Sequence, residues 1–252
     1  MPNIIDTQTI DLDFKIPQSE VMEFTFDYFK NSHISKHMIE NVFNNTGINS
    51  RQFVSTRDWF DIQHSFLDKN ELYVNKALEL SSKLVSKYRD LDYDSIDNII
   101  FVSSTGLSTP SIDALFINEL KLNSHITHTP VWGLGCVGGA VGLSKAYEYS
   151  LAYPDRLTLL ISLEFCSLAF LDQDHSKSNF IAMALFSDGA ASALVCGDEY
   201  KNRGKIKILK THSTLYYEST DVMGWELVDS GLKAIFSKDI PNIVKNKVSA
   251  DI

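Results

Sequence analysis

The chain has 252 residues, of which 44% are hydrophobic and 22% are charged, and its net charge is −9. This composition is typical of a folded protein and excludes a disordered chain. The acidic balance argues against a nucleic-acid-binding protein, which usually presents a basic face. The length is sufficient for one large domain or two small ones.

The N-terminus and the cysteines indicate the cellular setting. Residues 1–14 lack a basic segment followed by an apolar run, so we expect no secretory signal, and no uncharged apolar stretch is long enough to span a membrane. The three cysteines, Cys136, Cys166 and Cys196, are widely spaced, which argues against a disulfide framework or a zinc site. We therefore expect a cytoplasmic protein without a membrane span, a bound metal or a cofactor.

The first 100 residues are predicted to be mostly helical. A helix is expected over residues 19–30, with Ser19 as its N-cap. A second helix is expected over 35–44, and a longer one begins after Asn70.

Beyond this point, strands are predicted to alternate with helices. Thr109 is expected to cap a helix that has Pro110 at its first position. The expected strands lie at 98–106, 129–132, 157–164, 191–197 and 205–212, and the expected helices at 109–120 and 137–153. This alternation predicts an α/β fold with a largely parallel central sheet.

The last residues, DIPNIVKNKVSADI (239–252), predict a helix with Pro241 at its start. No further strand is predicted after it. We therefore expect this chain to be one half of something larger.

Cys136 lies within the glycine-rich segment WGLGCVGGAVG (132–142), at a predicted junction of strand and helix. A helix N-terminus stabilises a thiolate, and glycines permit unusual backbone angles and the close approach of a substrate. The same pattern is also typical of a buried structural cysteine beside a tight helix crossing. From these residues alone, Cys136 is either a nucleophile or a packing residue, whereas Cys196 is expected to be buried.

Four motifs together resemble one enzyme family. The segment VWGLGCVGGAVGLSKA resembles the nucleophile segment of the type III polyketide synthases, the chalcone and stilbene synthase family. FVSSTGLSTPSID, ALFSDGAASALV and DVMGWELVDSGLKAIFSKDIP are similar to three further segments of that family, the last in its bacterial style. The resemblance covers the chain from about residue 15 onward. Initiating ketoacyl synthases and hydroxymethylglutaryl-CoA synthase share the cysteine but do not usually carry the last stretch.

The resemblance implies a thiolase-like layered αβαβα fold whose second half is largely missing. Residues 1–212 would form the N-terminal half with the nucleophile, and residues 213–252 would begin a truncated C-terminal half. It also implies a homodimer, acyl-CoA and malonyl-CoA as substrates, and no cofactor.

Site residues follow from the same resemblance. Cys136 matches the nucleophile that takes a starter acyl group from coenzyme A, and Phe186 matches the aromatic residue at the gate between the coenzyme A tunnel and the cavity. Ser104 and Thr105 match polar cavity positions near the dimer contact. Thr109 matches a residue that reaches into the partner's cavity.

Four other positions are assigned in the same way. Cys166 matches a cavity-lining position. Ala169 and Ala234 match positions where plant members carry a hydroxyl and a phenylalanine, so their smaller side chains indicate a different, longer-chain cavity. Arg51 matches the region that places basic residues against coenzyme A phosphates, although its neighbours here are uncharged.

The resemblance implies decarboxylative Claisen condensation through an acyl-enzyme, with enolate donors supplied by a histidine and an asparagine of the second half. Those motifs are not found in this chain, so we expect condensation to be impaired. His125 and His128 form an HxxH pair that we expect at the surface, without a third metal ligand. Asp188, in a DGAAS turn, is expected to bond the backbone.

Three alternatives remain open beside the polyketide synthase. The chain could be a non-catalytic half of a disrupted or split synthase, with a separate C-terminal half as its partner. It could be a condensing enzyme like the initiating ketoacyl synthases. A thiol hydrolase is the third, and it lacks a convincing base.

Overall fold

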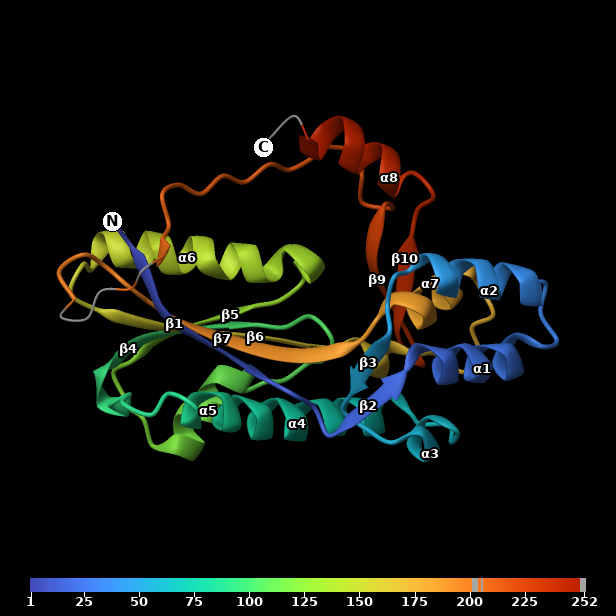
Figure 1. The fold of residues 1–252 in the computed structure, drawn as a ribbon. Helices are drawn as coiled ribbons and strands as arrows, with labels where there is room; N and C mark the ends of the chain where they lie inside the picture. Colours follow the sequence, from blue (N-terminus) through green and yellow to red (C-terminus); the bar gives the residue numbers. More distant parts are fainter. Residues whose placement is uncertain (201–203, 205, 250–252) are drawn as a thin grey trace. The chain divides into compact units, whose positions relative to one another are not determined.

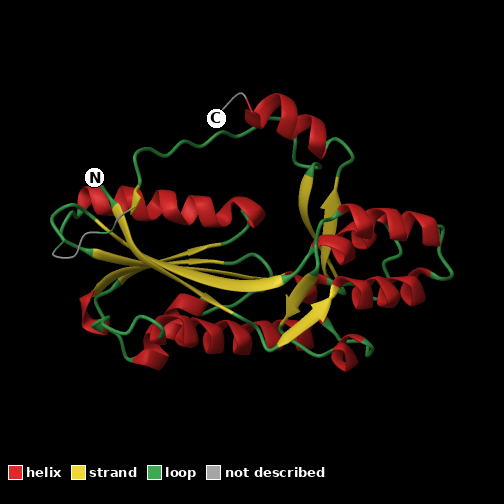
Figure 2. Cartoon of the chain, in the orientation of Figure 1, coloured by secondary structure: helices red, strands yellow, loops and turns green. Residues whose placement is uncertain are grey.

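The computed structural model describes residues 1–200, 204 and 206–249. The chain divides into two compact units, each built from three separate stretches of sequence (Figures 1 and 2). The first unit comprises Met1–Asp11, Asn70–Glu164 and Gly189–His212, and the second comprises Leu12–Lys69, Phe165–Asp188 and Ser213–Ile252. The predicted division into 1–212 and 213–252 stays a prediction.

The first unit is built around a six-stranded sheet in the order β5-β4-β6-β7-β1-β8. Its strands are β1 (Asn3–Ile10), β4 (Ile96–Val102), β5 (Thr127–Val131), β6 (Leu157–Phe165), β7 (Asp188–Cys196) and β8 (Ile206–Lys207). β4 runs parallel to β5 and β6, whereas β1 is antiparallel to β7 and β8. The predicted α/β class is therefore confirmed, and the sheet is mixed.

The central strands are buried because helices cover both faces of the sheet. α4 (Phe66–Ser86) and α5 (Ile112–Leu120) lie on one face, and α6 (Gly138–Ala152) lies on the other (Figure 1). β4 and β6 are accordingly almost continuous apolar runs. On the α6 side, Ala146 joins Val102, Leu160 and Val195 in a buried cluster.

The glycines of α6 bring this helix unusually close to the sheet. A Cβ at Gly142 would lie 2.6 Å from Leu160 Cδ1 and 3.0 Å from Val102 Cγ2, and one at Gly138 would lie 2.6 Å from Val102 Cγ1. A Cβ at Gly139 would instead meet Ser162 Oγ at an ordinary 3.7 Å. Two of the three helix glycines are thus required by packing.

The second unit contains three packed helices and two short antiparallel ladders. α1 (Gln18–Phe29), α2 (Lys36–Asn45) and α7 (Lys177–Leu185) enclose a cluster of Phe29, Ile34, Ile39, Phe43, Phe180 and Ala184. β2 (Phe14–Pro17) pairs with β3 (Ser50–Phe53), and β9 (Met223–Val228) pairs with β10 (Gly231–Phe236). The shorter helices are α3 (Arg57–Phe60) and α8 (Ile240–Ile243), which continues as a π-helix over Val244–Val248.

Several predicted boundaries are wrong, and the reasons are local. α1 begins at Gln18 with Pro17 at the N-cap, so Ser19 is already helical. α5 begins at Ile112 with Ser111 at the N-cap, so Thr109 lies in the preceding turn. The strand predicted over 205–212 is reduced to β8, and residue 205 lies outside the described residues.

Other predicted helices are present, some with shifted bounds. α2 has Ser35 at its N-cap, whose hydroxyl accepts from the Met38 amide, close to the predicted 35–44. α4 begins at Phe66, a turn earlier than predicted. α8 has a proline in its first turn, as predicted for Pro241, while residues 250–252 lie outside the described residues. In the part of the chain that is described, no helix is both long enough and apolar enough to cross a membrane.

The packing of α6 yields a matched pair of substitutions. Alanine stabilises a helix by about 1 kcal/mol relative to glycine, and we expect Gly139→Ala to show a gain of up to that size. Gly142→Ala should instead lower the free energy of unfolding by about 1–3 kcal/mol, because its methyl group meets Leu160 and Val102. Urea unfolding of both variants checks this, and equal gains for both would show that the close approach is not a constraint.

Candidate functional site

Cys136 is exposed in a tight turn immediately before α6. It lies in the 3-10 turn Gly135–Val137, which follows β5 and leads directly into the helix. Gly133 has φ +82° and Gly135 has φ +51°, a backbone conformation that other residues rarely adopt. Before the cysteine, Gly133 and Gly135 are required for their backbone conformation. After it, Gly138 and Gly142 are required because the helix packs closely on the sheet. The thiol itself remains accessible.

Ser104 and Thr105 follow β4 in the same unit, and both are buried. The Ser104 amide donates to both carboxylate oxygens of Glu164, at 2.9 and 3.0 Å, and its hydroxyl donates at 2.9 Å. Burial raises the pKa of Glu164, while the hydrogen bonds from Ser104 and Thr105 act in the opposite direction. The predicted polar positions are thus organised by a partly buried carboxyl group.

Glu164 was not among the predicted site residues. It lies near the end of the apolar strand LTLLISLEF, where a single carboxylate is conspicuous. A charged residue within a buried strand requires hydrogen-bond partners, so this pattern could have identified it.

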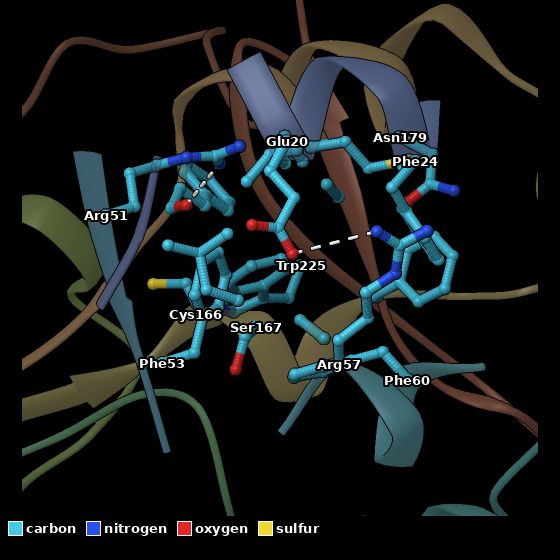
Figure 3. Close-up of a pocket in the computed structure, with 18 residues that line it drawn as sticks. Glu20, Phe24, Arg51, Phe53, Arg57, Phe60, Cys166, Ser167, Asn179 and Trp225 are labelled. Carbon is cyan, nitrogen blue, oxygen red and sulfur yellow. Dashed lines mark hydrogen bonds and ion pairs between the residues drawn. The ribbon is translucent and has the colours of Figure 1, made fainter. Parts of the chain in front are cut away.

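A pocket in the second unit brings together five predicted site residues, one of which is Arg51. Cys166, Ala169, Phe186 and Ala234 all line it, together with Trp225, which sequence analysis did not single out (Figure 3). The remaining lining residues are Ile16, Glu20, Val21, Phe24, Arg51, Phe53, Arg57, Phe60, Ser167, Phe170, Asn179, Ala182 and Met183. The wall is mostly aliphatic and aromatic.

Phe186 is held between the end of α7 and the β9–β10 hairpin. It is the C-cap residue of α7, and its amide donates to the Ala182 carbonyl at 2.8 Å. Its ring meets Trp225 with centroids 5.9 Å apart and Phe236 with centroids 5.4 Å apart. The hairpin therefore supplies the aromatic surroundings of the predicted gate residue.

Arg51, on β3, is buried in the pocket wall. Its Nη1 donates to the Phe186 carbonyl at 2.6 Å, whereas its Nε and Nη2 have no hydrogen-bond partner among the described residues. Burial lowers the pKa of Arg51 to about 10, and the nearby Asp188 carboxylate opposes this shift. The guanidinium remains charged at neutral pH. It faces little solvent, and its predicted role toward coenzyme A phosphates stays a prediction.

The backbone-bonding role predicted for Asp188 is confirmed. Its Oδ2 accepts from the Val54 amide at 2.8 Å and from the Ser167 hydroxyl at 2.5 Å, and its Oδ1 accepts from the Ser167 amide at 2.8 Å. This fully buried carboxyl group therefore joins the segment after β3 to the 3-10 turn Cys166–Ala169.

The remaining candidates lie elsewhere. Thr109 is exposed in the first unit. His125 and His128 are both exposed, as predicted, and the His128 Nδ1 pairs with the buried carboxylate of Asp113. Within the described ranges no cluster of three histidine, cysteine or carboxylate side chains could hold a metal ion.

The environment of Asp188 predicts a pH-dependent stability. Burial raises the pKa of its carboxyl group to about 6, above the unfolded value near ~4, so the folded protein binds the proton more tightly. This group's contribution to stability is therefore complete below pH ~4 and is lost as the pH rises through about 6. Asp188→Asn stays neutral and removes this contribution.

We expect the difference in unfolding free energy between the wild type and Asp188→Asn to change by roughly 2–3 kcal/mol over that range. Denaturant unfolding at several pH values measures it. A difference that is constant with pH would contradict the raised pKa.

Comparisons with known proteins agree on one family. A family model described as "FAE1/Type III polyketide synthase-like protein" matches residues 11–222. A Bacillus subtilis (strain 168) protein, provisionally named a chalcone synthase, is 40% identical over 252 residues that cover 95% of this chain and 69% of that protein. A 1,3,6,8-tetrahydroxynaphthalene synthase of Streptomyces peucetius subsp. caesius is 29% identical and is covered over 63% of its length, with 93% of this chain aligned.

The fold agrees as well. The crystal structure of 1,3,6,8-tetrahydroxynaphthalene synthase from Streptomyces coelicolor A3(2), a bacterial type III polyketide synthase, superimposes with a TM-score of 0.92. The superposition covers 98% of this chain and 71% of that chain, at 24% identity. The thiolase-like fold class is thus confirmed. The chain belongs to the FAE1/type III polyketide synthase-like family.

Proposed function

We propose that this chain takes part in polyketide synthesis as an acyltransferase, with Cys136 as the nucleophile that accepts the acyl group of an acyl-CoA. The observation that carries this proposal is the exposed thiol in a glycine turn at the start of α6, in a chain that belongs to this family. Its exposure is unusual for a structural cysteine, since free cysteines are commonly buried.

The proposed reaction proceeds in two stages. The Cys136 thiolate attacks the thioester carbonyl of the acyl-CoA, the bond from carbonyl carbon to coenzyme A sulfur breaks, and the coenzyme A thiolate leaves and takes up a proton. Malonyl-CoA then loses CO2, and its enolate carbon attacks the acyl group on the cysteine. The new carbon–carbon bond forms as the Cys136 thiolate is released. The histidine and asparagine that the resemblance assigns to enolate stabilisation are not found in this chain, so we expect this second stage to be impaired.

The backbone of the turn suits this chemistry. Cys136 lies at the N-terminal end of α6, where the helix dipole favours negative charge, although the Val137 and Gly138 amides already donate to the Leu134 and Gly135 carbonyls. A tetrahedral oxyanion that develops next to Cys136 would be stabilised in the same way. The glycines add no side chains that would obstruct the approach of the thioester.

We further propose that the pocket of the second unit binds the alkyl part of an acyl substrate. The walls around Cys166, Ala169 and Ala234 are apolar and carry small side chains, as expected for an extended aliphatic group. The wider assignment includes a homodimer, in which the exposed Thr109 would contact the partner, and a cytoplasmic location.

Acylation of Cys136 tests the proposal directly. The full chain is incubated with radiolabelled hexanoyl-CoA and digested, and the labelled peptide is identified by mass spectrometry. We expect label on the Cys136 peptide and at least a hundredfold loss of label in Cys136→Ala, since a thioester cannot form there.

Two other cysteines provide the matched controls. Cys166→Ser should keep the label on Cys136, and Cys196, which is fully buried in β7, should remain unlabelled in every variant. Label that is absent from Cys136, or that persists undiminished in Cys136→Ala, would overturn the proposed function.

A further inference from the structure

An ion pair borders the apolar pocket of the second unit. Glu20, in the first turn of α1, lies with its Oε1 3.6 Å from Nη1 of Arg57, the first residue of α3. The Arg57 Nε also lies 4.0 Å from Asp61 Oδ2. Glu20 and Arg57 both line the pocket, and their side chains are each 42% exposed, so the pair stands where the pocket meets solvent.

Arg57 lies at one side of the pocket and Arg51 at the other, and the Glu20 carboxylate lies between them in this view (Figure 3). Figure 3 shows Arg57 beside Phe60 on one side, and Arg51 and Cys166 on the opposite side. Arg51 has two unpartnered, buried nitrogens, which are suited to the polar end of a ligand. A ligand with its polar end at Arg51 would therefore direct its apolar end toward the Glu20–Arg57 pair.

The other polar side chains of the wall are already engaged. The Ser167 hydroxyl donates to Asp188 at 2.5 Å. The Asn179 amide group donates to the carbonyls of Leu171 and Asp174, at 3.0 and 2.6 Å. The space between the two ends thus offers aliphatic and aromatic contacts, which an unbranched alkyl chain can use along its whole length.

The ion pair limits this favourable contact. Each methylene group buried against the apolar wall strengthens binding by about fourfold. A methylene group that reaches the pair instead displaces water from two charged groups without replacing their hydrogen bonds, which opposes binding.

We propose that the Glu20–Arg57 ion pair is a polar stop that sets the maximum length of the unbranched alkyl chain held in this pocket. The inference rests on the proposed function for the presence of an acyl group, and it adds the class of acyl chain and the residues that determine its length. Both residues are specificity-determining and neither takes part in the acyl transfer.

The test measures the binding of saturated fatty acids, from hexanoate to palmitate, by displacement of a fluorescent fatty acid from the full chain. In the wild type, we expect affinity to rise with each added methylene and then to level off. In Arg57→Leu and Glu20→Leu the affinity should continue to rise with chain length. We expect each of these variants to bind palmitate roughly tenfold more tightly than the wild type does.

Two variants serve as controls. Arg57→Lys keeps the positive charge and should keep the wild-type limit. Glu148→Gln removes a similarly exposed charge from the Lys145–Glu148 pair of α6, outside the pocket lining, and should also leave the limit unchanged. Circular dichroism checks that each variant is folded. Arg57→Leu and Glu20→Leu each remove one charge of the ion pair, so they test the polar stop independently.

The outcomes separate this inference from the proposed function. If the leucine variants level off at the wild-type length, or if fatty acids do not bind the wild type, the polar stop is overturned whatever happens at Cys136. If Cys136 is never acylated but the binding limit moves as expected, the stop is supported and the proposed function fails.

Discussion

The hydrogen bonds of Asp188 hold together the pocket of the second unit. One buried carboxyl group binds the amide of Val54, the amide of Ser167 and the hydroxyl of Ser167. These bonds join the segment after β3 to the turn that carries Cys166 and Ala169, and Arg51 adds a bond to the Phe186 carbonyl. A buried carboxyl group that lost these partners would be costly, so the three segments are fixed relative to one another.

In the first unit, Cys136 is positioned by the packing of α6 on the sheet. α6 can approach β4 and β6 only because Gly138 and Gly142 lack side chains, and this approach fixes the helix on the sheet. The turn with Cys136 is continuous with that helix, so the thiol is held by a rigid element although it is exposed. If Cys136 is the nucleophile that we propose, this fixed position would reduce the loss of freedom on reaching the transition state.

The sequence pattern predicted those elements whose conformation is determined by the spacing of their own apolar residues. β4, β6 and α6 were predictable because their apolar residues recur with the spacing of buried strands and of a helix. β1 was not, because the polar residues Asp6 to Thr9 acquire a strand conformation through pairing with β7. The β9–β10 hairpin was likewise missed, although its two-residue connection before Gly231 is a recognisable signal.

The same division applies to the site. The resemblance placed Cys166, Ala169, Phe186 and Ala234 at the cavity or its gate, and the structure does bring them together. Ser104 and Thr105, which the resemblance also assigns to the cavity, are not among the residues that line this pocket. Glu20 and Arg57 could not be found in this way, because their pairing depends on how α1 and α3 pack. Arg51 was selected for its charge, and only the structure reveals that its side chain is buried.

The β9–β10 hairpin has a consequence for how the pocket can vary. In the described part of the chain its two strands pair only with each other, while Trp225 and Ala234 project into the pocket and Phe236 meets the Phe186 ring. Substitutions in this ribbon would therefore reshape the wall of the pocket without altering the six-stranded sheet or the turn of Cys136. The pocket wall and the turn that presents the thiol are thus built from separate elements, so the wall can vary at little cost to the sheet.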